Sequence, residues 1–151
     1  MLRKPREARA AGFTLVELVV TIALLGIIMA IAVPQFNEYI RASKRADATG
    51  VLTEAGQFME RNFSNTGSYL SDSAGNNIAL PAGLAVAPRS ASAGEAYYNI
   101  SFVATPTDSA FTLQAVPVNS MSGDSCGTFT LTNTGVRAVS GSRPLGECWK
   151  S

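Results

Sequence analysis

Glu17 is the one acidic side chain in an otherwise apolar stretch, and it is the first residue of this sequence whose type and position imply chemistry. From Phe13 to Val33 no other side chain carries a charge. A carboxylate inside a membrane costs about 2.5 kcal/mol or more near the bilayer centre, so such acids usually have a partner. No cation lies within the stretch. Cleavage of the chain after Gly12 would supply one, because the new α-amino group of Phe13 is positively charged at neutral pH.

Cys126 and Cys148 are the second set of residues that imply chemistry, since they are the only cysteines in the chain. If the segment that carries them lies outside the cytoplasm, a disulfide between them would persist. The bridge would close a loop of about twenty residues, which the chain-entropy model values at roughly 3 kcal/mol. Two free thiols are the alternative.

Catalytic and metal-binding chemistry is not indicated elsewhere. The chain has no histidine, and two cysteines are too few for a thiol-rich metal site. The sequence shows no Gly-rich phosphate loop and no nucleophile beside a base, so it predicts neither an enzyme nor a bound cofactor or metal. Asp72, Asn76 and Asn77 are oxygen-bearing residues that could ligate calcium. Turn formation explains them better, because their spacing matches no known calcium loop.

The apolar stretch is long enough to cross a membrane. At a rise of about 1.5 Å per residue, residues 13–33 would span roughly 30 Å, the thickness of a hydrocarbon core. Residues 1–12 precede it and carry one acid against four basic residues: Arg3, Lys4, Arg6 and Arg9. By the positive-inside rule these basic residues stay in the cytoplasm and the bulk of the chain is exported.

Three simpler explanations of this stretch compete. An ordinary signal peptide would be cleaved near Ala30-Ile31-Ala32, and a plain single-pass anchor would need no cleavage. Neither explains Glu17. In the third, Glu17 is protonated and lies near the membrane interface.

Residues 12–17, Gly-Phe-Thr-Leu-Val-Glu, together with the apolar run that follows, resemble the class III leader and N-terminal helix of type IV pilins and their pseudopilin relatives. The resemblance rests on a short basic leader that ends in glycine, then phenylalanine, and a glutamate at the fifth mature position. It implies that a membrane-embedded prepilin peptidase cuts after Gly12 and N-methylates Phe13. It also implies that Glu17 pairs with the N-terminus of a neighbouring subunit during filament assembly.

One helix is predicted over 13–63, transmembrane over 13–35 and amphipathic over 36–63. Gly26 and Pro34 fall where the family has a helix-loosening glycine and a proline, and Pro34 predicts a kink or local melting because it lacks an amide donor. Apolar residues at helical spacings form a stripe beyond it: Phe36, Tyr39, Ile40, Val51, Leu52, Ala55, Phe58, Met59 and Phe63. Charged residues mark the predicted solvated face: Glu38, Arg41, Lys44, Arg45, Asp47, Glu54, Glu60 and Arg61. Contact of residues 41–47 with acidic headgroups or a neighbour is the alternative.

The remainder of the chain, residues 64–151, predicts a globular head. Residues 64–96 are rich in Ser, Asn, Gly, Ala and Pro and predict a long connecting loop. Alternating apolar and polar residues predict two hairpins, one formed by 98–103 and 111–116, the other by 128–132 and 136–139. The expected fold is α+β: a long N-terminal helix, transmembrane in its first half, packed on a small four-stranded antiparallel sheet, the pilin fold.

The C-terminal region adds to the resemblance. Residues 126–137 with Cys-Trp at 148–149 look like the tail of a minor-pilin-like subgroup, and a C-terminal disulfide resembles type IV pilins rather than secretion pseudopilins. The resemblance implies a structural subunit of a type IV pilus, assembled with other pilin subunits by inner-membrane machinery into a helical filament for motility, adhesion or DNA uptake. The protein would be a single-pass inner-membrane protein first and part of an extracellular fimbrium afterwards.

Two other functions stay open. Beyond the leader the chain has eight basic and ten acidic residues, which argues against a general nucleic-acid surface. Arg137, Arg143 and Lys150 lie in the C-terminal region and are candidate DNA contacts of a competence pilin. A solvated surface is the simpler explanation, because Asp124 and Glu147 are interspersed. The other alternative is a type II secretion pseudopilin.

Overall fold

The computed structural model describes residues 12–89, 91–92 and 94–149, so residues 1–11 of the leader and Lys150 lie outside the described residues. One helix, α1 (Leu15–Thr66), runs through two compact units, which divide after Glu38. The helix begins two residues later and ends three residues later than the sequence predicts. It ends where Gly67 adopts a left-handed φ of 74° and its N–H donates to the Phe63 carbonyl at 2.7 Å, a common helix C-cap.

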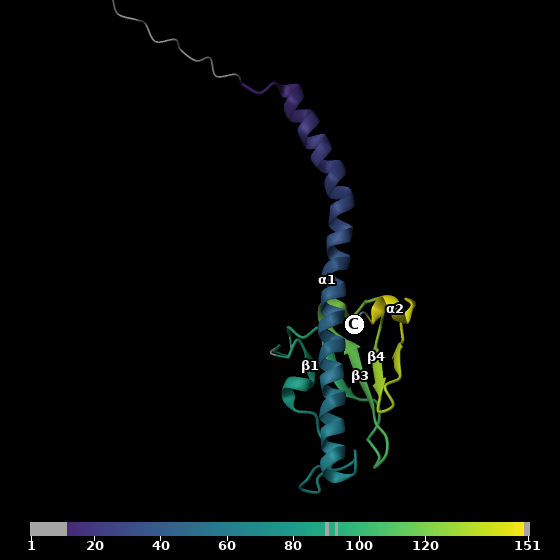
Figure 1. Cartoon of the computed structure of the whole chain (residues 1–151). Helices are drawn as coiled ribbons and strands as arrows, with labels where there is room; N and C mark the ends of the chain where they lie inside the picture. The colour runs from purple at the N-terminus through teal and green to yellow at the C-terminus, as the bar shows by residue number, and fades with distance from the viewer. Residues whose placement is uncertain (1–11, 90, 93, 150–151) are drawn as a thin grey trace, which may run out of the picture. The chain divides into compact units, whose positions relative to one another are not determined.

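The second unit contains a five-stranded antiparallel sheet whose strands follow one another in chain order (Figure 1). The strands are β1 (Val86–Ala87), β2 (Tyr98–Phe102), β3 (Thr112–Pro117), β4 (Phe129–Thr132) and β5 (Arg137–Val139). Two 3-10 turns, η1 (Ala82–Leu84) and η2 (Asn119–Met121), and a short helix, α2 (Leu145–Cys148), complete the unit. Both predicted hairpins are therefore confirmed, with strand bounds that differ by at most one residue.

The prediction of four strands is wrong by one. The additional strand, β1, has only two residues and lies inside the segment predicted as a connecting loop. Val86 pairs with Asn99 and Ala87 pairs with Tyr98, so β1 extends the first hairpin at the edge of the sheet. Two residues are too few to show an alternating pattern in a sequence.

One face of the sheet packs against the second half of α1. The buried sheet residues are Tyr98, Ile100, Leu113, Ala115, Phe129 and Leu131. The buried apolar helix residues are Ala48, Val51, Leu52, Ala55 and Met59, which include four members of the predicted stripe. Phe36 and Tyr39 also belong to that stripe, but their side chains are 63% and 73% exposed. The core of the head therefore begins about two helical turns after Tyr39.

Gly56 and Gly141 permit two close approaches within this unit. A Cβ on Gly56 would lie 3.1 Å from Leu131 Cδ2, so the glycine lets α1 come near β4. A Cβ on Gly141 would overlap the Ser125 carbonyl oxygen. Gly141 also donates its N–H to the Cys126 carbonyl at 3.0 Å, which holds the chain after β5 against the segment before β4.

We expect Gly141→Ala to destabilise the head by about 1–3 kcal/mol, because the added methyl group must displace backbone rather than a flexible side chain. Gly146→Ala is the matched control, since a Cβ there meets no atom within 4 Å. Thermal unfolding of the full chain in detergent, followed by circular dichroism, measures both. Equal melting temperatures for the two variants would contradict the predicted overlap.

Candidate functional site

The bond predicted to be cleaved lies ahead of α1. Gly12, Phe13 and Thr14 have no regular secondary structure, and the Phe13 side chain is 87% exposed. An exposed, non-helical segment is the kind of backbone that a peptidase can bind and cut. The backbone at the Gly12–Phe13 bond is therefore exposed and not helical, and cleavage there stays a prediction.

Thr14 and Glu17 form a capping box at the start of α1. Glu17 Oε2 accepts hydrogen bonds from the Thr14 N–H at 2.9 Å and from the Thr14 hydroxyl at 2.8 Å. In return, Thr14 Oγ1 accepts the Glu17 N–H at 3.2 Å. Each side chain thus satisfies a backbone donor that the helix leaves free.

This cap is a role of Glu17 that the sequence reasoning missed. The signal was present, because Thr-x-x-Glu directly before an apolar run is the known signature of a capping box. The carboxylate therefore has hydrogen-bond partners within its own chain before any cleavage. The cap supplies no positive charge, so an amine stays the predicted charged partner of Glu17.

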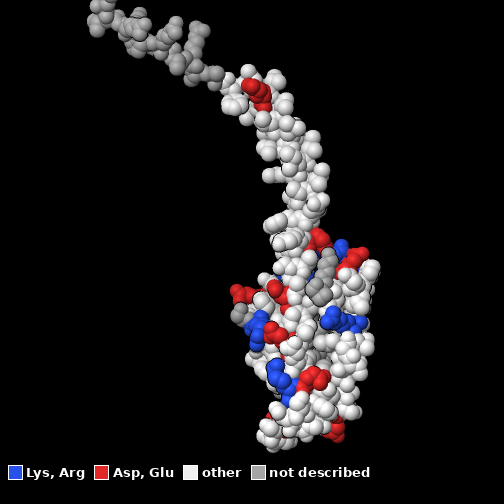
Figure 2. Space-filling view, in the orientation of Figure 1, with Lys and Arg blue, Asp and Glu red and all other residues white. Residues whose placement is uncertain are grey.

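The first part of α1 is apolar on its whole circumference. Glu17 and Glu38 are the only charged residues among residues 12–38, and Figure 2 shows an almost continuous uncharged surface there. The large apolar side chains from Phe13 to Phe36 are each 49–87% exposed. Part of α1 is long and apolar enough to cross a membrane, and none of that part is buried by the rest of the chain. An apolar surface of this extent needs lipid or other helices around it.

Gly26 and Pro34 lie within α1, and the helix continues through both. The backbone around Pro34 is helical, so the local melting predicted there does not occur in the structure. A bend at either residue stays a prediction.

Arg45 is not on the solvated face where the sequence analysis placed it. It is 2% exposed, and its Nε lies 3.1 Å and 2.9 Å from the two carboxylate oxygens of Asp124, while its Nη2 also contacts Oδ1. Asp124 Oδ2 further accepts the Tyr98 hydroxyl at 3.3 Å and the Cys126 N–H at 3.2 Å. This buried ion pair connects α1 to the segment beside the cysteine. No local pattern could reveal it, because its partners are 79 residues apart.

The ion pair changes the ionisation of the groups around it. Burial alone would raise the pKa of the Asp124 carboxyl, but the hydrogen bonds and the charge of Arg45 outweigh burial and hold this pKa below its usual value. Burial raises the pKa of the Tyr98 hydroxyl well above its ordinary value, and the negative charge of Asp124 adds to this effect. At neutral pH, Asp124 is therefore ionised and Tyr98 is a neutral donor.

Cys126 and Cys148 form a disulfide, with their Cα atoms 5.7 Å apart. The bridge ties α2 to the segment before β4. Trp149, next to it, packs edge-to-face on Phe129 with ring centroids 5.5 Å apart. The C-terminal end of the described chain thereby becomes part of the core.

The proposed DNA contacts do not form a free basic cluster. The Arg137 guanidinium lies over the Trp149 ring, 5.2 Å from its centroid, and Arg143 Nε lies 3.8 Å from a Glu147 carboxylate oxygen. Lys150 is outside the described residues. Asp124 was expected to be interspersed among these charges, but it is buried with Arg45.

Asp72 forms a turn. Its Oδ1 accepts the N–H groups of Ala74 and Asn76, each at 2.9 Å, and the Gly75 N–H donates to its carbonyl at 3.0 Å. The hydrogen bond from the Asn76 backbone is the main reason that the pKa of Asp72 is lowered. Among the residues that the structure describes, no group of three or more His, Cys, Asp or Glu could hold a metal ion.

Two family models match the chain in adjoining segments. Residues 8–33 match the model described as the prokaryotic N-terminal methylation motif. Residues 34–130 match the model described as type IV minor pilin ComP, DNA uptake sequence receptor. The second match alone covers more than half of the chain.

Curated relatives match over the N-terminal part. Type IV major fimbrial protein FimA of Dichelobacter nodosus is 46% identical over 46 residues, which are 30% of this chain and 28% of FimA. Fimbrial protein EcpC of Eikenella corrodens is 34% identical over 68 residues, which are 45% of this chain and 44% of EcpC. The matched stretches thus span less than half the length of these relatives.

Two solved structures are similar. A type IV pilin from Shewanella oneidensis is 31% identical with a TM-score of 0.46, over 72% of this chain and 97% of that chain. The non-core minor pilin PilV of Neisseria meningitidis is 22% identical with a TM-score of 0.51, over 70% of this chain and 92% of that chain. The likeness to PilV concerns the fold, a long N-terminal helix on an antiparallel sheet.

We expect acid to destabilise the head through Asp124. Because the folded-state pKa of this carboxyl is lowered, its stabilising effect is complete above the unfolded value of about 3.9 and is lost as the pH falls through the folded value. Asp124→Asn should cost about 3 kcal/mol at neutral pH, since it leaves Arg45 buried without a countercharge. Urea unfolding of the full chain in detergent, repeated between neutral pH and acid, measures both effects. Asp47→Asn, which removes an exposed carboxyl on α1, is the control, and an equal pH dependence in the two variants would refute this prediction.

Proposed function

Since the chain belongs to the type IV pilin family, in the group whose model is described as type IV minor pilin ComP, we propose that it is a structural subunit of a type IV pilus. Members of this family are structural subunits rather than enzymes. The proposal includes cleavage after Gly12 by a prepilin peptidase and N-methylation of Phe13. It also includes residence in the inner membrane before assembly by inner-membrane machinery, and a place in the extracellular filament afterwards. The proposed parts are leader 1–12, membrane helix 13–35, amphipathic helix 36–63 and head 64–151.

The observation that carries this proposal is the exposed apolar surface of the first part of α1. The part of α1 that is long and apolar enough to cross a membrane is 0% buried within the described chain, although the head has its own core. In a bilayer, lipid covers this surface. In a filament, the same surface packs against the helices of other subunits, and small residues such as Gly26 and Ala30 allow close packing.

The polymer is open-ended because two different surfaces of the subunit meet at each contact. Each subunit binds one neighbour through one surface and the next neighbour through another, so the contact repeats without closing and gives a helical filament. Glu17 can then set the register. An incoming helix that is out of register leaves this carboxylate without a charged partner in an apolar environment, which costs about 2.5 kcal/mol or more at the bilayer centre.

The capping box is compatible with such a pairing. The cap uses only one of the two carboxylate oxygens of Glu17. Oε2 accepts the Thr14 N–H and the Thr14 hydroxyl, and the third contact is made by the Glu17 N–H to Thr14 Oγ1. A carboxylate has about four lone-pair positions on its two oxygens, so Oε1 can accept an amine while Oε2 holds the cap. The cap would also fix the side chain in one orientation before the partner arrives.

DNA binding is a second candidate function, because the family model over residues 34–130 is described as a DNA uptake sequence receptor. The three proposed contacts Arg137, Arg143 and Lys150 all lie outside this matched range. Within the range, Arg41 and Arg61 are exposed basic residues. The pseudopilin alternative is not supported further, since the relatives named above are fimbrial proteins and pilins.

We expect Glu17→Ala to leave membrane insertion intact and to lower incorporation into filaments by at least about tenfold, because the charged partner for an incoming amine is removed. Thr14→Val separates this role from capping, since it removes the hydroxyl but keeps the carboxylate. It should retain most incorporation. Immunoblots of membranes and sheared filaments measure both steps, and mass spectrometry checks that each variant begins at Phe13. Equal losses in the two variants would assign Glu17 to capping alone.

If the chain binds DNA, we expect reversal of Arg41 and Arg61 to glutamate to lower the affinity and to reduce the slope of log K against log salt by about one per contact removed. Reversal of Arg137, Arg143 and Lys150 should change the affinity less than about twofold, because Arg137 and Arg143 already contact Trp149 and Glu147. Fluorescence anisotropy of labelled duplex DNA with the full chain in detergent measures this. A larger loss of affinity in the C-terminal variant would instead assign DNA binding to Arg137, Arg143 and Lys150.

A further inference from the structure

The outer face of the sheet, which points away from α1, consists of uncharged side chains. We define it as the residues of the strands, and of the positions directly beyond the strand ends, that alternate with the buried ones. Strand register and the backbone hydrogen bonds at the strand ends place them in three rows. The rows are Val86, Asn99, Val116, Thr128 and Ser140; then Ser101, Gln114, Thr130 and Ala138; then Val103, Thr112, Thr132 and Val136.

This face lacks charge although the chain beyond its leader does not. The five strands that the structure describes contain one charged residue, Arg137. It lies opposite Leu131 and therefore belongs to the other alternating set, and its guanidinium lies over the Trp149 ring. The chain beyond its leader has eighteen charged residues, so a face of thirteen uncharged residues does not reflect a general lack of charge.

Much of the hydrogen-bonding capacity of the outer face is unused. Gln114 Nε2 donates to Ser101 Oγ at 3.2 Å. Among the residues that the structure describes, the side chains of Asn99, Thr112 and Thr130 have no hydrogen-bond partner. Methyl groups of valine, threonine and alanine lie between these polar groups. The face therefore presents donors, acceptors and small apolar contacts at the regular spacing of a sheet.

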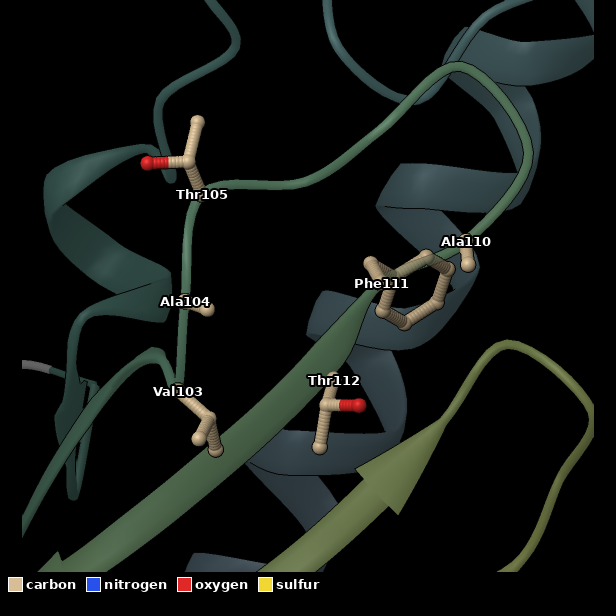
Figure 3. A pocket seen from close by; sticks show the side chains of 6 residues that line it. All are labelled: Val103, Ala104, Thr105, Ala110, Phe111 and Thr112. Carbon is tan, nitrogen blue, oxygen red and sulfur yellow. The ribbon is translucent and has the colours of Figure 1, made fainter.

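A hollow of about 160 Å³ adjoins the third row. Figure 3 shows it between residues 103–105, which follow β2, and residues 110–112, which lead into β3. Val103 and Thr112 belong both to the outer face and to the lining of the hollow. Its other lining residues are also uncharged: Ala104, Thr105, Ala110 and Phe111.

We propose that the outer face of the sheet binds a neutral polysaccharide, with the hollow receiving one sugar ring or substituent. The hydroxyls of an uncharged glycan exchange hydrogen bonds with the Ser, Thr, Asn and Gln side chains, and its C–H groups contact the methyl groups. DNA and anionic glycans are disfavoured on this face, because binding them requires Lys or Arg to replace their counterions.

A second copy of the chain is a poorer occupant. Three rows about 6.7 Å apart, each with four or five positions about 4.8 Å apart, cover roughly 200–250 Å² in projection. A stable protein interface needs about 800 Å² from each partner. A site of this size binds weakly when alone. A filament that repeats it along a polymer gains avidity of about 10²-fold or more, and this step rests on the proposed function.

The test uses the full chain in detergent and filaments that contain it. Each is sedimented with insoluble cellulose and with insoluble chitin as neutral probes, and with DNA-coated polystyrene beads as the anionic probe. Thr130→Lys places a charge at the centre of the second row, opposite Gln114 and Ala138. Ser73→Lys places the same charge in the exposed turn after Asp72 and is the matched control. Melting temperatures check that both variants fold.

Wild-type and Ser73→Lys chains should sediment with at least one neutral probe, with less than about twofold change between low salt and a salt level that screens charges. Thr130→Lys should lower the bound fraction at least fivefold, which corresponds to the loss of about 1 kcal/mol of binding free energy, the net value of a typical hydrogen bond. Its incorporation into filaments should be unchanged.

Three results would overturn the proposal: no sedimentation of the wild type with either neutral probe, strongly salt-dependent binding, or binding by Thr130→Lys at the wild-type level. So would exclusion of Thr130→Lys from filaments with unchanged sedimentation, which would assign the face to a second copy. Absence of the wild type from filaments would instead count against the pilus function, since the solubilised chain still tests the sheet face.

Discussion

The structure depends on one constraint: α1 must satisfy two environments with a single continuous helix. Its first part presents large apolar side chains on every side, and no other part of the described chain covers them. Its second part buries one face in the head and exposes the other. An all-round apolar helix is stable in lipid or among other helices, whereas a one-sided helix is stable against a sheet in water. The change between the two patterns, rather than any catalytic group, determines what this molecule can do.

The head is held to the helix by interactions that are distant in sequence. The Arg45–Asp124 ion pair and the Tyr98 hydroxyl join α1, β2 and the segment before the disulfide. The disulfide and the Phe129–Trp149 contact then secure the C-terminal end. Breaking a buried ion pair by removing one partner costs more than forming it gains, so an arrangement of helix and head that separates Arg45 from Asp124 is disfavoured.

The sequence predicted what is encoded locally and missed what is not. Helix period and strand alternation predicted α1 and both hairpins, but β1 has too few residues for a pattern. The partners of Arg45 could not be predicted, because its spacing in the helix fits a solvated face and its countercharge lies 79 residues away. The Thr14–Glu17 capping box is different. It is a local motif, so the sequence carries enough information to predict it.

The alternation of the strands also separates two tasks of the sheet. Because successive side chains point to opposite faces, each strand contributes one set to the core with α1 and another to the outer face. Substitutions on the outer face can therefore alter what the head binds without removing core contacts such as those of Leu113 and Phe129. The proposed assembly function depends on α1, and the proposed binding surface depends on the strands. A subunit built in this way can keep its place in a polymer while its outer surface changes, and repetition along the polymer makes a weak surface useful.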